Sequence, residues 1–147
     1  PASNRPPSAP AAGGSATVDV GTTNRSGGLI DFGVSATGIV NTDNADGTLG
    51  GWATVNGSDY AKVQGGSIVA FTAADYTDKD EAATWLNNEF ISDSDGDAFS
   101  FSGTVAGSKQ LGGLQYTTAA NSTVNVDAGQ TLGVFAGPTS VGASSPR

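Results

Sequence analysis

Short runs in which hydrophobic and polar residues alternate recur along the chain and predict β-strands. The runs cover residues 16–20, 28–32, 37–40, 49–55, 59–63, 67–72, 98–105, 112–117, 122–126 and 131–135. Apolar residues that share one strand face are Val18 and Val20, Ile30 and Phe32, Phe99 and Phe101, and Val124 and Val126. A spacing of about 8–12 residues, with Gly, Asn and Asp in between, suits a sandwich, a barrel or a solenoid. The runs are short and carry few bulky side chains, which favours a solenoid whose coils cover one another.

The prolines divide the chain into a body and two tails. All six lie at positions 1, 6, 7, 10, 138 and 146, so that residues 11–137 contain none. Because proline cannot donate to a β-ladder, the long proline-free stretch indicates continuous sheet with Gly and Asn turns. We therefore expect an arm or linker at 1–14, a β-solenoid body at 15–137 and a tail at 138–147.

An acidic segment near residues 75–97 interrupts the strand pattern. It holds eight of the fourteen Asp and Glu residues, and Asp78 and Glu81 have the spacing of a helix-capping box. The apolar residues that follow recur at helical spacing: Ala82, Trp85, Leu86 and Phe90. This pattern predicts a helix over residues 78–90, as one short helical and acidic excursion from the β body.

Charge and residue usage exclude several classes of function. The formal net charge is −8, and the six Lys and Arg residues are scattered, which argues against nucleic acid and anionic membranes as partners. No stretch is long and apolar enough for membrane insertion. Cys and His are absent, so that disulfides, a Ser–His–Asp triad and histidine metal sites cannot form. These features predict a non-enzymatic, extracellular protein.

One acidic cluster is a candidate cation site. Asp93, Asp95 and Asp97 alternate with Ser94 and Gly96, and three carboxylates at alternate positions could surround Ca²⁺ with oxygen ligands. The spacing does not fit the EF-hand loop. The competing interpretation is a solvated Asp/Ser/Gly turn.

Aromatic and asparagine residues provide two further sets of candidates. Tyr60 and Tyr76 could contact a glycan through their ring faces, although aromatic residues more often pack in cores. For Trp52 core packing is the favoured interpretation. Three Asn-x-Ser/Thr triplets are candidate glycosylation acceptors, namely Asn24, Asn56 and Asn121.

The body resembles the repeat regions of autotransporter-type surface proteins, the autotransporter-associated β-strand repeat class. The residues that carry the resemblance are TVDVG (17–21), GGLIDF (27–32), LGGWATVNGSDYA (49–61), SIVAFTAADYT (67–77) and NSTVNVDAGQTLGV (121–134). The resemblance implies a right-handed parallel β-helix exported to the cell surface, usually without catalytic activity. The 147 residues depart from that class in two ways, since they are fewer than in such passengers and the resemblance includes no membrane-barrel translocator. A β-sandwich remains the alternative fold.

Two functions follow from this picture. The main hypothesis is a structural protein, a segment or self-assembling subunit of a surface fibre, sheath or layer. Self-association would use the open sheet ends and the terminal arms, because unpaired strand edges readily accept another strand. The alternative is an adhesin-type module that binds glycan or a host or cell surface.

Overall fold

Parallel pairing between strands about one coil apart organises the molecule. A computed structural model describes residues 15–93, 101–117 and 121–134. The strands are β1 (Thr17–Asp19), β2 (Ile30–Phe32), β3 (Ile39–Asn41), β4 (Gly47–Thr48), β5 (Ala53–Val55), β6 (Asp59–Gln64), β7 (Ser67–Ala70), β8 (Thr77–Asp78), β9 (Phe90–Ser92), β10 (Thr104–Val105), β11 (Lys109–Leu111), β12 (Gly113–Gln115), β13 (Asn125–Val126) and β14 (Leu132–Val134). Two one-turn 3-10 helices, η1 (Ala73–Asp75) and η2 (Ala82–Thr84), complete the described elements.

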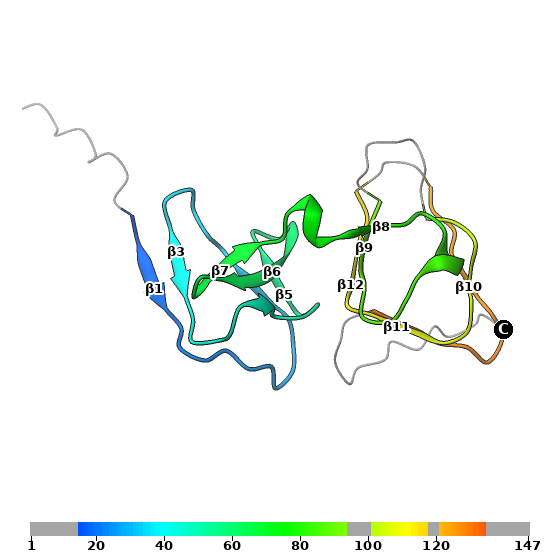
Figure 1. Ribbon diagram of the computed structural model, residues 1–147, viewed down its shortest axis with the longest axis horizontal. Helices are drawn as coiled ribbons and strands as arrows, with labels where there is room; N and C mark the ends of the chain where they lie inside the picture. Colours follow the sequence, from blue (N-terminus) through cyan, green and yellow to red (C-terminus); the bar gives the residue numbers. More distant parts are fainter. Residues whose placement is uncertain (1–14, 94–100, 118–120, 135–147) are drawn as a thin grey trace, which may run out of the picture.

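Six parallel pairs join the described strands. One is β8–β9, and the other five stack successive coils. They are β1–β3, β2–β5, β9–β12, β10–β13 and β11–β14. Many of the hydrogen bonds that side chains make between neighbouring coils join residues 21 to 23 positions apart. In Figure 1 the green, yellow and orange segments of residues 77–93, 101–117 and 121–134 overlie one another around a common outline. The chain is thus a β-solenoid of about five turns, which confirms the predicted all-β solenoid over the β-sandwich.

Two asparagine side chains form hydrogen bonds between neighbouring coils in the first half of the chain. The Asn56 Oδ1 atom accepts from the Val34 N–H at 2.8 Å, and its Nδ2 donates to the Val34 carbonyl at 3.0 Å. Asn44 makes the same pair of bonds to Thr23, at 2.7 and 2.9 Å. Each side-chain amide replaces a peptide group in the ladder, which satisfies backbone groups that a turn would otherwise leave unpaired.

An antiparallel hairpin interrupts the parallel stacking. Strands β6 and β7 pair through four positions, and β6 also pairs antiparallel with β5 and β4. The connecting residues Gly65 and Gly66 have φ of 59° and 77°, the left-handed values that a tight type I′ hairpin turn requires. This hairpin lies between the first coils and the coils that begin at β8.

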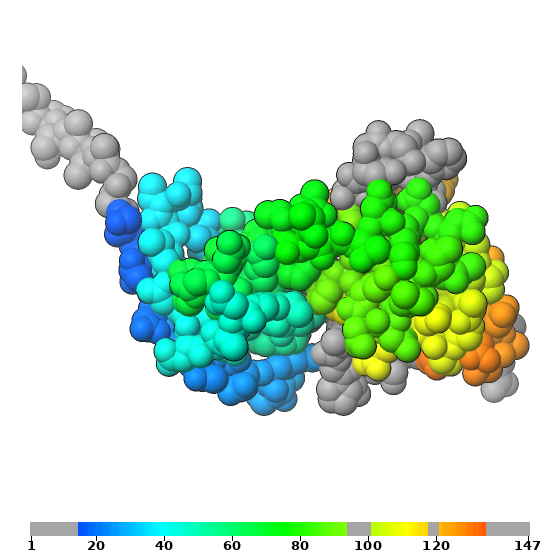
Figure 2. Space-filling view, viewed as in Figure 1, coloured from blue at the N-terminus to red at the C-terminus, as the bar shows by residue number. Residues whose placement is uncertain are grey.

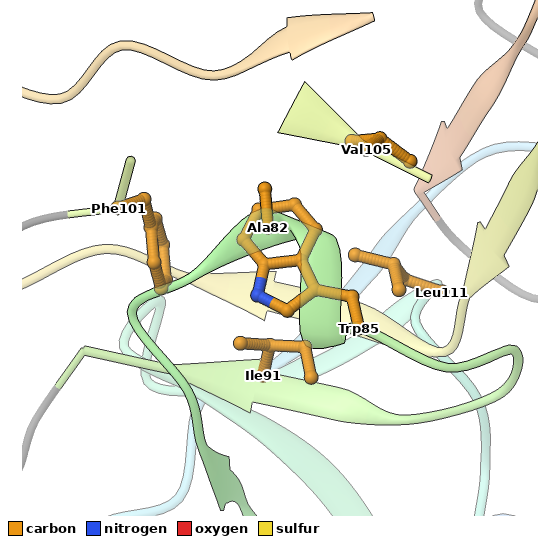
Figure 3. Close-up of a cluster of buried hydrophobic side chains, with 6 residues drawn as sticks. All are labelled: Ala82, Trp85, Ile91, Phe101, Val105 and Leu111. Carbon is orange, nitrogen blue, oxygen red and sulfur yellow. The ribbon is translucent and has the colours of Figure 1, made fainter. Parts of the chain in front are cut away.

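Two apolar clusters form the core. One lies in the first half of the chain and includes Phe32, Val55 and Ile68. In the second cluster the indole of Trp85 is 0% exposed and lies among side chains from several coils (Figure 3): Ala82, Ile91, Phe101, Val105 and Leu111. Figure 2 shows the two halves in contact along the green segment.

The predicted helix over residues 78–90 is wrong. Only Ala82–Thr84 are helical, the residue at the N-cap is Glu81 rather than Asp78, and β9 begins at Phe90. The backbone around Ala82 instead bonds to the next coil, since Ala82 N–H donates to the Ser102 carbonyl at 2.9 Å. Asn88 adopts a left-handed φ of 67°, which a continuous helix does not allow. Leu86, expected on the buried stripe, is 56% exposed.

The terminal arms predicted at residues 1–14 and 138–147 lie outside the described residues. Within the described part of the chain, no helix has the length and apolar character needed to cross a membrane.

Candidate ligand-binding groove

A groove of about 440 Å³ opens where strands β2, β5 and β6 meet β12. Its apolar lining comes from Leu29, Ile30, Trp52, Tyr60 and Leu114. The strand registers place Asp31 opposite Thr54 and Thr54 opposite Tyr60, so these three side chains share one face of the sheet. Leu29 and Trp52 come directly before β2 and β5 and line the same groove. Residues of β2, β5 and β6 form the floor of the groove, and β12 forms its wall.

The same short sequence pattern supplies three parts of the lining. A Gly-Gly pair precedes Leu29, Trp52 and Leu114. The first two copies are aligned by the β2–β5 register, in which Ile30 faces Ala53. In the third copy a Cβ on Gly113 would lie 2.5 Å from the Tyr60 ring, so only glycine lets the wall come this close to the floor.

Tyr60 joins the floor to the wall. Its hydroxyl donates to the Leu114 carbonyl at 3.0 Å and accepts from the Leu114 N–H at 2.9 Å. Its ring makes an edge contact with Phe90, with centroids 5.0 Å apart. Gln115 Nε2 adds bonds to the Ser58 carbonyl at 3.2 Å and to Asp59 Oδ1 at 3.0 Å. These contacts fix the position of β12 beside β6.

Trp52 presents a polar atom beside this apolar surface. The side chain is half-buried and packs against the first core cluster. Among the described residues its indole N–H has no hydrogen-bond acceptor, whereas the Trp85 indole N–H donates to the Lys79 carbonyl at 3.0 Å. Trp52 also lines a second, polar depression with Asn24 and Asn44. An indole in this position can contact a ligand through both its ring and its N–H.

Two carboxylates lie at the polar edge of the groove. Asp31 Oδ1 accepts from the Thr54 hydroxyl at 2.8 Å and from the Gly57 N–H at 2.7 Å. The carboxylate of Asp59, two residues after Gly57, accepts from the Ser58 hydroxyl at 3.0 Å. Both carboxylates therefore flank the turn of residues 56–58. Within the described ranges neither forms an ion pair.

The ion pairs that the structure does describe lie elsewhere. They join Lys62 to Asp75 and Lys79 to Glu89, each with an N···O distance of 2.7 Å. Hydrogen bonds from Lys62 and from the Thr72 backbone lower the pKa of Asp75 to about 2. Among the residues that the structure describes, no lysine or arginine lines the groove.

The two tyrosines predicted to contact a glycan have different surroundings. Tyr60 is 8% exposed, and burial raises the pKa of its hydroxyl. Tyr76 is half-buried, its hydroxyl donates to Asp59 at 3.2 Å, and burial likewise raises its pKa. Together with Phe71 and Phe90 they form an aromatic cluster with centroids 4.9 to 6.3 Å apart. Of the two, Tyr60 lines the groove.

The candidate calcium ligands are only partly described. Asp93 is 1% exposed, and its Oδ1 accepts from the N–H and the hydroxyl of Thr117 at 2.7 and 2.9 Å. Asp95 and Asp97 lie outside the described residues. The described ranges contain no group of three or more acidic, histidine or cysteine side chains that could hold a metal ion. The calcium site stays a prediction.

The candidate glycosylation acceptors are all exposed. Asn56 uses both of its amide atoms in the bonds to Val34. Asn24 lines the polar depression beside Trp52, and Asn121 follows a segment outside the described residues. Glycosylation at these positions stays a prediction.

Sequence reasoning missed Leu29, Leu114, Asp31 and Asp59 as groove residues. The repeated Gly-Gly pair followed by a large apolar residue was the available signal for the two leucines. The carboxylates carry no motif, because they meet only through the turn at residues 56–58.

Comparison with known proteins gives one informative similarity. Over 123 residues, or 83% of the chain, the sequence is 55% identical to the autotransporter adhesin BmaC of Brucella suis biovar 1 (strain 1330). The chain spans about 4% of the length of that relative. No family model matches the chain, and no solved structure matches it. This similarity and the β-solenoid fold confirm the predicted resemblance, because over these residues the chain is similar to part of an autotransporter adhesin.

Proposed function

We propose that the chain is a non-enzymatic, adhesin-type module of a cell-surface or secreted protein, and that it contacts its ligand through the groove beside Trp52. The similarity to an autotransporter adhesin supports adhesion better than it supports the fibre subunit that was our main hypothesis. The observation that carries the proposal is the exposed apolar surface at the groove, where Leu29 is 72% exposed. A concave surface with a mostly apolar lining and a few polar groups is the usual form of a ligand site.

The size and make-up of the groove suit a ligand site. Its volume of about 440 Å³ lies in the range of about 300–1,000 Å³ that is usual for such sites. An apolar floor with a few polar groups at its edge provides both contact area and orientation. The hydrogen bonds of Tyr60 and Gln115 hold the wall in place before a ligand arrives, which reduces the entropy lost on binding.

Adhesion by coated beads tests this proposal. Fluorescent beads that carry the chain should bind cultured mammalian epithelial cells, and Leu29→Glu should reduce the number of bound beads about tenfold, because it places a charge on the apolar floor. Leu86→Glu is the matched control, since Leu86 is 56% exposed and lies outside the groove. Trp52→Ala should have an effect similar to that of Leu29→Glu. Equal binding by the Leu29 and Leu86 variants would exclude the groove as the adhesive site.

Self-association is a second candidate function, and the unpaired edge of strand β1 supports it. In the described residues β1 pairs with β3 alone, so one of its edges is unpaired. Val18 on this strand is 53% exposed, and Val20 and Ile39 beside it are also exposed. Figures 1 and 2 place β1, in blue, at one end of the described part of the chain. An unpaired apolar edge can accept a strand from a second copy.

Sedimentation velocity tests the second candidate. The chain should form species heavier than a monomer as its concentration rises, and Val18→Lys should prevent this while Leu86→Lys should not. A monomer at every concentration would exclude self-association through β1. The predicted calcium site is tested separately, by a rise in melting temperature with Ca²⁺ that a chelator reverses and that Asp93→Asn abolishes.

A further inference from the structure

We propose that the groove binds a lysine or arginine side chain of a partner polypeptide. The inference rests on the proposed adhesive function and adds the chemistry of the ligand to it. Three features of the described residues carry it: the charge at the edge of the groove, the apolar floor, and the open indole of Trp52.

The charge at the groove favours a cation. Asp31 and Asp59 flank one turn, and within the described residues neither is neutralised by a lysine or arginine. Their hydrogen-bond donors are neutral groups: hydroxyls, an amide side chain and a backbone N–H. Two like charges at the edge of an apolar surface attract a positively charged group and repel an anion. The net charge of −8 acts in the same direction.

The apolar floor fits the rest of such a side chain. Lysine and arginine bury their aliphatic stems on apolar surface while the charged head stays at a polar edge. Leu29 and Leu114 would contact the stem, and the two carboxylates would receive the head. A cation over the indole of Trp52 gains a further attraction from the ring. The combination favours a basic peptide over a neutral sugar, which would leave both carboxylates without a charged partner.

A titration followed by NMR tests the inference on the full 147-residue chain. The probe is a capped heptapeptide of alternating valine and lysine, compared with the same peptide carrying glutamine or glutamate in place of each lysine. The indole N–H signal of Trp52 should shift with the lysine peptide. The signal of Trp85, which is 0% exposed, serves as the internal control and should stay in place.

The expected order of affinities is lysine above glutamine by about tenfold, with no binding of the glutamate peptide. The double variant Asp31→Asn, Asp59→Asn should lose about fivefold to tenfold in affinity for the lysine peptide, since each exposed charge pair contributes modestly. Asp127→Asn removes one exposed charge outside the groove and should leave the affinity unchanged.

Three results would overturn the inference: equal affinity for the lysine and glutamine peptides, full binding by the double variant, or a Trp52 shift with cellohexaose but not with the lysine peptide. The bead assay separates this failure from that of the proposed function. If Leu29→Glu abolishes adhesion while no basic peptide binds, the groove is adhesive and the ligand class is wrong. If Leu29→Glu leaves adhesion intact, the proposed function itself fails.

Discussion

Replacing Tyr60 by phenylalanine should destabilise the protein by about 2 kcal/mol. The hydroxyl makes two hydrogen bonds to the backbone of Leu114, at 3.0 and 2.9 Å, and the residue is buried. An intramolecular hydrogen bond contributes about 0.5–1.5 kcal/mol, and an orphaned buried partner costs about 1–3 kcal/mol. Because Leu114 is half-buried, the loss of its two hydrogen bonds to Tyr60 should cost about 2 kcal/mol in total. For a chain of this size that loss lowers the melting temperature by roughly 6–8 °C.

Thermal unfolding followed by circular dichroism measures this shift. Tyr116→Phe is the matched control, because Tyr116 is exposed and its hydroxyl forms no hydrogen bond within the described residues. The control should unfold within about 1 °C of the wild-type chain. Equal melting temperatures for the Tyr60→Phe and wild-type chains would show that the hydroxyl does not hold β12 against β6. The rigid groove wall would then have no physical basis.

Three further predictions concern stability. Gly113→Ala should lower the free energy of unfolding by about 1–3 kcal/mol through overpacking, because its Cβ would lie 2.5 Å from an aromatic ring. Gly133→Ala should lower it less, because no neighbour lies closer than 3.6 Å to a Cβ at that position. The urea midpoints of the two variants measure the difference. Asn56→Gly keeps the left-handed φ of 54° available but removes two hydrogen bonds between coils. The free energy of unfolding should therefore fall by about 1–2 kcal/mol. Unchanged stability would contradict a role of the Asn56 side chain in joining the coils. Hydrogen bonding to Lys62 holds the pKa of Asp75 at about 2, below its unfolded value near 3.8, so the stabilisation present above pH 4 should be lost as the pH falls towards 2. In Asp75→Asn the urea midpoint should depend less on pH over this interval, and an identical dependence would contradict the assignment.

The strand positions of the solenoid could be predicted from the sequence. Alternation gave runs at 59–63 and 67–72, and strands β6 and β7 occupy these positions at Asp59–Gln64 and Ser67–Ala70. Short runs with glycine turns also indicated a solenoid. The Gly65-Gly66 pair between these two runs is a hairpin signal, because both glycines can adopt the left-handed φ of a tight turn.

The helix was mispredicted because local periodicity competed with bonds between coils. Ala82 and Trp85 are buried, as a helical stripe would require, but they face the core from a single 3-10 turn. The parallel bridge between Glu81 and Ser102 depends on a residue 21 positions away, which no local pattern reveals. Phe90 satisfied the helical spacing by coincidence, and its strand pairs with β12.

The groove could not be predicted from the sequence alone, because its residues meet only in the folded chain. Leu29, Trp52 and Leu114 come from separate coils, and their shared Gly-Gly pattern does not show that they meet. The two carboxylates are brought to one turn by a hydrogen bond from Gly57 to Asp31. Burial of Tyr60 likewise follows from its partner 54 residues away, which sequence proximity could not indicate.

Photo-crosslinking on intact cells tests the adhesive groove most directly. The chain would carry benzoylphenylalanine in place of Leu29 or, in a second preparation, in place of Leu86, both exposed positions. After irradiation of bound chain, the derivative at position 29 should form a covalent adduct with a cell-surface protein, and the derivative at position 86 should not. Adducts of equal yield from both positions, or from position 86 alone, would contradict the account.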